Sequence, residues 1–259
     1  MDFSKKPIIA CVHLLPTPGA PLYDGDLDKI YEMALSDVRI FTEAGVDGII
    51  VENFRDTPFY PESLPPETIA TLAAVTREIV TKVDISVGVG ALRNDAEAAV
   101  AIATATQANF VRVNVHVGAV LAEQGIVLGK SYKTLRLREA LKSTVPIFAD
   151  ARVKHSAPLA YDTLAEEVRD LGPRAEAIII SGPRTGMEAT IADIDVVKAV
   201  SDNPVLIGTG ITPTNIERFY EAADGFIVGS YFKEDGKANN FVSHTRVQEF
   251  MDKVASLRR

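Results

Sequence analysis

The sequence contains one cysteine, no tryptophan and no long hydrophobic run. Because Cys11 is alone, an intrachain disulfide and a cluster of thiolate ligands are excluded, and a reducing cytoplasm is the expected location. The longest apolar runs have the length of single strands, so the sequence predicts no membrane-spanning helix. The first residues, MDFSKKPIIACVHLLP, indicate a strand rather than a signal peptide, since polar and Pro/Gly residues soon interrupt their apolar run.

Positive charge is also scarce. The chain has 27 Lys and Arg against 35 Asp and Glu, a formal net charge of -8 at pH 7. A nucleic-acid surface needs a basic stripe, and a membrane surface favours a basic amphipathic segment. The sequence shows neither, so we expect a small-molecule ligand and no nucleic-acid partner. A homo-oligomer is compatible with the sequence.

Short apolar segments alternate with segments of helical pattern along the whole chain. Eight strand–helix units in 259 residues predict an α/β fold, a single-domain TIM (β/α)8 barrel over residues 1–259. A doubly wound sheet is the alternative, although it rarely needs so many regular units. The predicted strands are 7–13, 46–52, 84–90, 108–114, 146–150, 177–181, 204–208 and 225–229, and the helices lie near 28–44, 67–82, 94–106, 131–142, 160–171, 192–201, 213–222 and 243–257.

In such a barrel the active site lies where strands end and βα loops begin. Here the predicted strand ends are polar. In FVRVNV the valines alternate with Arg112 and Asn114, so this pair is expected to point into the barrel. A buried charge needs a partner, and Glu52 and Asp150 end neighbouring strands. The four residues predict either an internal ion-pair network or a ligand-binding Arg beside a general acid or base.

Other polar residues at the strand ends extend this candidate site. His13 ends the first strand and is either a catalytic or a satisfied structural residue. Lys154 and His155, on the loop after strand 5, either bind a phosphate or carboxylate or lie solvated at the surface. A Schiff-base role for Lys154 is less favoured, because such lysines usually lie on a strand. Asn53 and Ser181 complete the predicted substrate-binding set.

Metal binding has a weak sequence signal. The four His residues are scattered without a helical H-x-x-x-H pair. Mg²⁺ needs few protein carboxylates, so the sequence permits, but does not favour, an ion held by Glu52, Asp150 and water. We expect no cofactor.

Glycines follow the last strands in a pattern typical of phosphate binding. The loops after strands 7 and 8, with a short extra helix, are the frequent phosphate site of this fold. Backbone N–H groups in such loops attract anions without much side-chain charge. A turn with no ligand is the alternative for each. The predicted phosphate-binding residues are Gly208, Thr209, Gly210, Gly229 and Ser230, with Gly182 from the Ser181–Gly186 turn, which could close over the same ligand.

Several stretches together resemble the BtpA/SgcQ family. They include HLLPTPGAP, VENFRDTPF, GVGALRND, DARVKHS, GTGITPTN and DGFIVGSYFK, in the family's order along nearly the full length. The resemblance implies a TIM barrel related to ribulose-phosphate-binding barrels, and it links cyanobacterial members to photosystem I accumulation. It implies no particular reaction. Arg55 and Ala122-Glu123 depart from the family's pattern in loops of the barrel mouth.

Two functional hypotheses follow. The first is an enzyme that acts on a phosphorylated sugar or nucleoside by carboxylate acid–base chemistry, as an isomerase, a lyase or an enzyme that cleaves a glycosidic bond. The second is a non-catalytic assembly factor that retains a ligand site. The interior Arg and its carboxylates favour the first, because they are costly to bury without a use.

Overall fold

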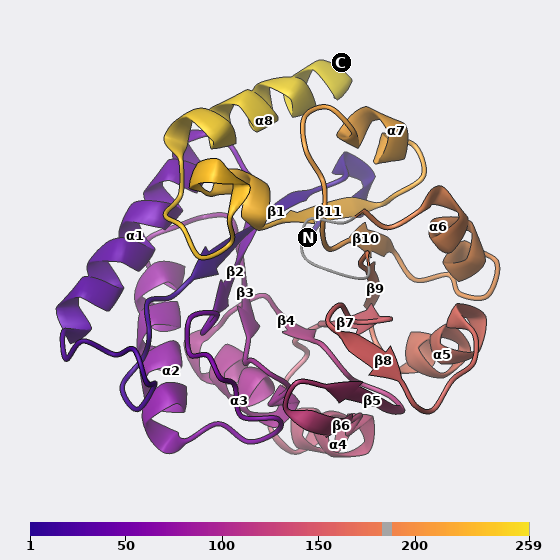
Figure 1. The fold of residues 1–259 in the computed structure, drawn as a ribbon, viewed down its shortest axis with the longest axis horizontal. Coiled ribbons are helices and arrows are strands. Elements are labelled where there is room, and N and C mark those ends of the chain that lie inside the picture. The colour runs from indigo at the N-terminus through magenta and orange to yellow at the C-terminus, as the bar shows by residue number, and fades with distance from the viewer. Residues whose placement is uncertain (183–187, 259) are drawn as a thin grey trace.

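The computed structural model describes residues 1–182 and 188–258, and its centre is a closed barrel of eight parallel strands. Each barrel strand lies beside the next one along the chain, and helices surround the ring (Figure 1). The predicted TIM barrel is therefore confirmed. Its strands are β1 (Ile8–His13), β2 (Gly48–Glu52), β3 (Ser86–Gly90), β4 (Phe110–Val113), β7 (Ile147–Ala151), β9 (Ala177–Ile180), β10 (Val205–Ile207) and β11 (Gly225–Val228).

Several of the outer helices begin at side-chain caps. The Asp95 side chain accepts from Ala98 N, and Thr163 forms a capping box with Glu166. The helices are α1 (Leu27–Glu43), α2 (Pro66–Val80), α3 (Ala96–Thr106), α4 (Ser131–Ala140), α5 (Leu164–Leu171), α6 (Ile191–Lys198), α7 (Ile216–Tyr220) and α8 (His244–Leu257). In residues 1–182 and 188–258, no helix is long and apolar enough to cross a membrane.

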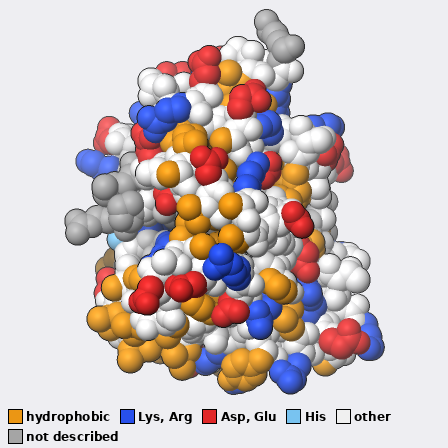
Figure 2. Space-filling model, turned by 90° about the vertical axis from the view of Figure 1, so that its right-hand side faces the viewer, with side chains coloured by type: hydrophobic (Ala, Val, Ile, Leu, Met, Phe, Trp, Pro, Cys, Tyr) orange, Lys and Arg blue, Asp and Glu red, His pale blue; other side chains and the backbone are white. Residues whose placement is uncertain are grey.

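A small second sheet occupies two segments that the sequence predicts as open loops. Strands β5 (Ala119–Ala122), β6 (Gly125–Leu128) and β8 (Ser156–Pro158) form an antiparallel sheet in the order β6-β5-β8. Val120 and Val127 pack under it with Val115 and Val153. Figure 2 shows hydrophobic side chains gathered at the lower end of the molecule, where this sheet and α4 lie in Figure 1. The exposed large hydrophobic residues of the small sheet are Leu121, Ile126 and Leu128.

Side chains alternate along the barrel strands, and this alternation separates two cores. On β4, Val111 and Val113 pack outward among the helices, whereas Phe110 points inward. The Phe148 ring stacks on Phe110, and Phe3 from the N-terminal segment packs against Phe148 with ring centroids 5.8 Å apart. Apolar residues thus fill the amino-terminal part of the barrel, and the inward polar residues lie toward the carboxyl ends of the strands.

Candidate functional site

Four ionisable residues point into the barrel from the carboxyl ends of neighbouring strands. They are His13 on β1, Glu52 on β2, Arg112 on β4 and Asp150 on β7. Their exposed fractions are 6%, 3%, 7% and 2%, so all four are buried. The predicted proximity of Arg112 to Glu52 and Asp150 is confirmed. The sequence did not predict that His13 joins them.

Arg112 and Asp150 form the tightest pair of this group. Arg112 Nε lies 2.9 Å from Asp150 Oδ2, and Nη2 lies 3.0 Å from Oδ1. Asn114 donates a further bond of 3.2 Å to Oδ2. Both oxygens of Asp150 are therefore occupied by protein donors, which compensates for the burial of the charges.

Glu52 is held less closely. Its Oε1 lies 3.5 Å from Arg112 Nη1, and its Oε2 lies 3.7 Å from His13 Nε2. Gly90 makes room for it, because a Cβ there would lie 2.9 Å from Oε1. Burial raises the pKa of Glu52, opposed by the charges of Arg112 and Lys154. Glu52 is thus a carboxyl group suited to exchange a proton.

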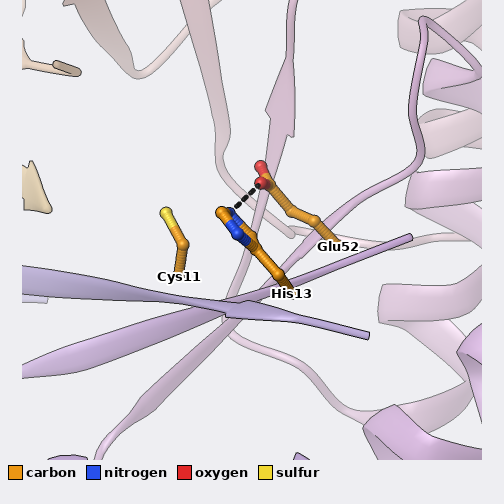
Figure 3. Close-up of side chains that lie close together, drawn as sticks. All are labelled: Cys11, His13 and Glu52. Atoms are coloured by element: carbon orange, nitrogen blue, oxygen red, sulfur yellow. Dashed lines mark ion pairs between the residues drawn. The ribbon is translucent and has the colours of Figure 1, made fainter. Parts of the chain in front are cut away.

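His13 is a neutral imidazole at physiological pH. Burial lowers its pKa well below the ordinary value, and the charge of Lys233 lowers it further. Its Nδ1 lies 3.1 Å from Ala238 O, and its ring stacks on Phe54 with centroids 3.9 Å apart. Figure 3 shows the imidazole directed at Glu52, with the Cys11 thiol beside it.

Lys154 reaches the same centre from the loop after β7. Burial lowers the pKa of its amine, and the neighbouring Arg112 lowers it further. The Lys154 carbonyl accepts a bond of 2.9 Å from Arg93 Nη2, and Arg93 Nη1 lies 3.4 Å from Asn114 Oδ1. Arg93 therefore fixes the Lys154 loop over the Arg112 pair. Arg93, three residues after the end of β3, is absent from the site predicted from sequence.

Two cavities meet at this centre. The larger one, about 250 Å³, opens beneath the loops after β2, β3 and β7, and the smaller one, about 30 Å³, lies under the ends of β10 and β11. They share Glu52, Phe54, Arg112 and Lys154 in their walls. The larger cavity is further lined by Phe59, Leu92, Arg93, Asn114, Glu123, Gln124 and His155.

The predicted phosphate-binding glycines line the smaller cavity. Gly208, Thr209, Gly210, Gly229 and Ser230 all contribute to its wall, and the predicted short helix appears as a 3₁₀ turn at Ser230–Phe232. Position 208 has no room for a larger residue than glycine, because a Cβ on Gly208 would lie 2.6 Å from Ile179 Cγ2 and 2.8 Å from Ser181 Oγ. Ser181 Oγ is buried and has no hydrogen-bond partner among the described residues.

Other predicted residues lie elsewhere. Gly182 is buried after β9, and the described lining of the two cavities contains neither Gly182 nor Ser181. Residues 183–186 of the predicted turn lie outside the described residues. Asn53 faces a third cavity of about 300 Å³, and its amide binds the backbone of Leu92 at 2.8 and 3.1 Å. The helix predicted near 213–222 begins later, at Ile216, and Thr212 N donates to the Asn215 side chain.

Comparison with known proteins places these features in a family. The sequence model of the BtpA family matches residues 4–256. An uncharacterised protein of Pyrococcus abyssi is 40% identical over 100% of this chain and 99% of its own length. The photosystem I biogenesis protein BtpA of Synechocystis is 38% identical over 97% of this chain and 89% of its own length.

Solved structures support the barrel fold. Phosphoribosyl anthranilate isomerase from Thermus thermophilus superposes with a TM-score of 0.58 at 13% identity, covering 97% of this chain and 99% of that one. Tryptophan synthase from Mycobacterium tuberculosis gives 0.62 at 16% identity, covering 97% and 94%. At these identities the likeness concerns the fold alone.

Proposed function

The chain belongs to the BtpA family, and we propose that it is a cytoplasmic enzyme acting on a phosphorylated sugar or nucleoside. The observation that carries this proposal is the pair of adjacent cavities at the carboxyl ends of the strands, which share four residues in their walls. One end offers glycine loops to a phosphate group. The other offers charged and aromatic side chains to the remainder of the molecule.

The smaller cavity suits an anion. Glycine backbone approaches it from the ends of β10 and β11, where this fold often binds phosphate. Arg112 and Lys154 add positive charge to its wall. Because it is small, about 30 Å³, we assign it the phosphoryl group alone and assign the organic part of the ligand to the larger cavity.

Glu52 is the group we assign to proton transfer. It lies between the two cavities, its pKa is raised by burial, and its Oε2 accepts no hydrogen bond from the described residues. Asp150 instead holds Arg112 in place. An isomerase, a lyase and an enzyme cleaving a glycosidic bond would each use one carboxyl group in this manner. The names of two structural neighbours, phosphoribosyl anthranilate isomerase and thiamine phosphate pyrophosphorylase, also include phosphorylated compounds.

A thermal-shift experiment tests the proposal. Orthophosphate, pentose phosphates and nucleoside monophosphates are compared with the matching unphosphorylated sugars and nucleosides. We expect stabilisation only by the phosphorylated compounds. Gly229→Ala should lower the affinity for the phosphorylated compounds roughly tenfold, or by about 1.4 kcal/mol of binding free energy. Its new methyl group would enter the small cavity, where the nearest protein atom, Cys11 Sγ, is 3.6 Å away. Equal stabilisation by unphosphorylated compounds would refute the phosphate assignment.

A second candidate function is assembly of a membrane complex, favoured by the name of the Synechocystis relative, photosystem I biogenesis protein BtpA. Affinity purification of the tagged protein from its own cells separates the two functions. Co-purification with a membrane complex that survives Glu52→Gln would favour assembly. Its loss in that variant would tie the interaction to the ligand site.

A further inference from the structure

Cys11 has no part in the proposed reaction, yet its thiol lies beside His13 and Glu52. Cys11 and His13 are two residues apart on β1 and therefore face the same side of the strand. Glu52 is the register partner of His13 on β2. One donor atom from each of the three lies within 4.8 Å of the other two (Figure 3). We propose that these three side chains bind one divalent metal ion of the zinc type.

The contact between His13 and Glu52 is the first argument. Ala238 O can only accept a hydrogen bond, so His13 Nδ1 carries the proton of the neutral ring and Nε2 presents a lone pair. That lone pair faces Glu52 Oε2 at 3.7 Å, too far for a hydrogen bond. No described donor binds either atom, and a metal ion between them would satisfy both.

The surrounding contacts are those of metal ligands. A histidine that binds a metal usually donates its other N–H to a carbonyl or carboxylate, which fixes the ring. Ala238 O is such a partner for His13. A ligating carboxylate is in turn bound through its second oxygen, as Glu52 Oε1 is by Arg112. All three proposed ligands line the smaller cavity, so a fourth position would open toward it.

The donor set favours zinc. Thiolate, imidazole and carboxylate are its protein ligands, at about 2.3, 2.0 and 2.0–2.2 Å, which places tetrahedral donors roughly 3.3–3.6 Å apart. The His13–Glu52 distance of 3.7 Å is near this range. The donors, all within 4.8 Å of one another, need a contraction of about 1.5 Å at most.

The positive charges of nearby side chains disfavour the binding of a metal cation. Arg112, Lys154 and Lys233 all act on the Cys11 thiol electrostatically. Loading releases the proton of the Cys11 thiol, and a divalent ion with one thiolate and one carboxylate then has no net charge. Because the ion and its two charged ligands are neutral together, they can lie at the same end of the barrel as the three cationic side chains.

Metal binding uses Glu52 Oε2, so in the loaded protein Glu52 is a ligand and the ion supplies a Lewis acid beside the anion cavity. The metal-free protein keeps Glu52 for proton transfer. The two proposals are therefore tested apart. Metal titration uses no phosphorylated compound, and Cys11 has no role in the acid–base hypothesis.

The experiment uses the purified full chain after treatment with a chelator and its removal. Isothermal titration with zinc chloride should show one ion per chain. Cobalt(II) should give thiolate-to-metal charge-transfer absorption that Cys11→Ser abolishes. Cys11→Ser and His13→Gln should each weaken zinc binding by more than the 10–100-fold typical of outer-shell changes. His244→Gln, at an exposed histidine, is the matched control and should bind as the parent does.

The folded state of each variant is checked by circular dichroism and thermal unfolding. Absence of stoichiometric zinc binding by the parent chain would overturn the proposal. So would parent-like affinity in both folded ligand variants, or a loss of binding in His244→Gln as large as theirs.

Discussion

The guanidinium of Arg112 binds the carboxylate of Asp150 through two hydrogen bonds of 2.9 and 3.0 Å. This geometry distinguishes Asp150 from Glu52, whose nearest approach to Arg112 is 3.5 Å. The sequence places both carboxylates at strand ends and makes Asp150 the first candidate for proton transfer, with Glu52 as an alternative base. In the structure Asp150 holds Arg112, and Glu52 Oε2 accepts no hydrogen bond from the described part of the chain.

Asp150→Asn should therefore destabilise the protein more than Glu52→Gln does. Removing the Asp150 charge leaves a buried guanidinium without its main partner, at a cost of about 3–5 kcal/mol. Glu52→Gln should cost less, since burial already disfavours the Glu52 charge. Urea unfolding measures both. Equal losses in free energy of unfolding would contradict the ranking.

Asn53 is predicted from sequence to bind the ligand. Its contacts instead predict that it stabilises the fold through the backbone of Leu92. Its side chain accepts from Leu92 N at 2.8 Å and donates to Leu92 O at 3.1 Å. Asn94 holds Val115 in the same way, at 2.8 and 2.9 Å. Asn53→Ala should cost about 2 kcal/mol, because it leaves buried backbone groups unpaired.

Asn94→Ala is the matched control. Urea unfolding should show losses of similar size for both variants, and orthophosphate affinity should be unchanged, since neither side chain lines the smaller cavity. A fall in phosphate affinity for Asn53→Ala alone would restore its sequence-based assignment.

These cases show which features of the molecule can be predicted from sequence. The inward direction of Arg112 follows from the period of two along a strand, which is local information. The pairing of β5 with β8 joins residues about 36 positions apart, and neither strand exceeds four residues, so no local pattern predicts it. Whether the Asn53 amide faces a ligand or a backbone depends on the Leu92 loop. Cys11 could have been found, because it shares the inward parity of His13.

Lys233 is a buried cation that directly follows the 3₁₀ turn Ser230–Phe232. It is fully buried, and its Nζ lies 3.0 Å from Cys11 O and 3.6 Å from Asp37 Oδ2. Lys233→Met should cost about 3–5 kcal/mol, since Asp37 loses its partner within the fold. The double variant Lys233→Met/Asp37→Asn should recover part of that loss, and a double-mutant cycle by urea unfolding measures the coupling. Strictly additive losses would show that the two residues do not stabilise each other.

His116 predicts a pH dependence of stability. Its Nε2 lies 3.0 Å from Arg174 O, and its Nδ1 is buried without a partner among the described residues. Burial lowers the pKa of His116 to about 4, whereas the unfolded chain has the ordinary value of about 6.5. Between these values the unfolded state binds more protons, so stability falls as the pH is lowered from 6.5 toward 4.

The loss from this one group amounts to about 3 kcal/mol at most, since each pKa unit is worth about 1.4 kcal/mol. His116→Gln keeps a donor for Arg174 O but does not titrate. The free energy of unfolding in urea should therefore fall less between pH 7 and pH 4 for the variant, by about 2–3 kcal/mol. Carboxylates elsewhere titrate in both proteins and cancel in the difference. Parallel pH profiles would mean that His116 accepts a proton in the folded state as readily as in the unfolded one, and its buried Nδ1 would then need an acceptor.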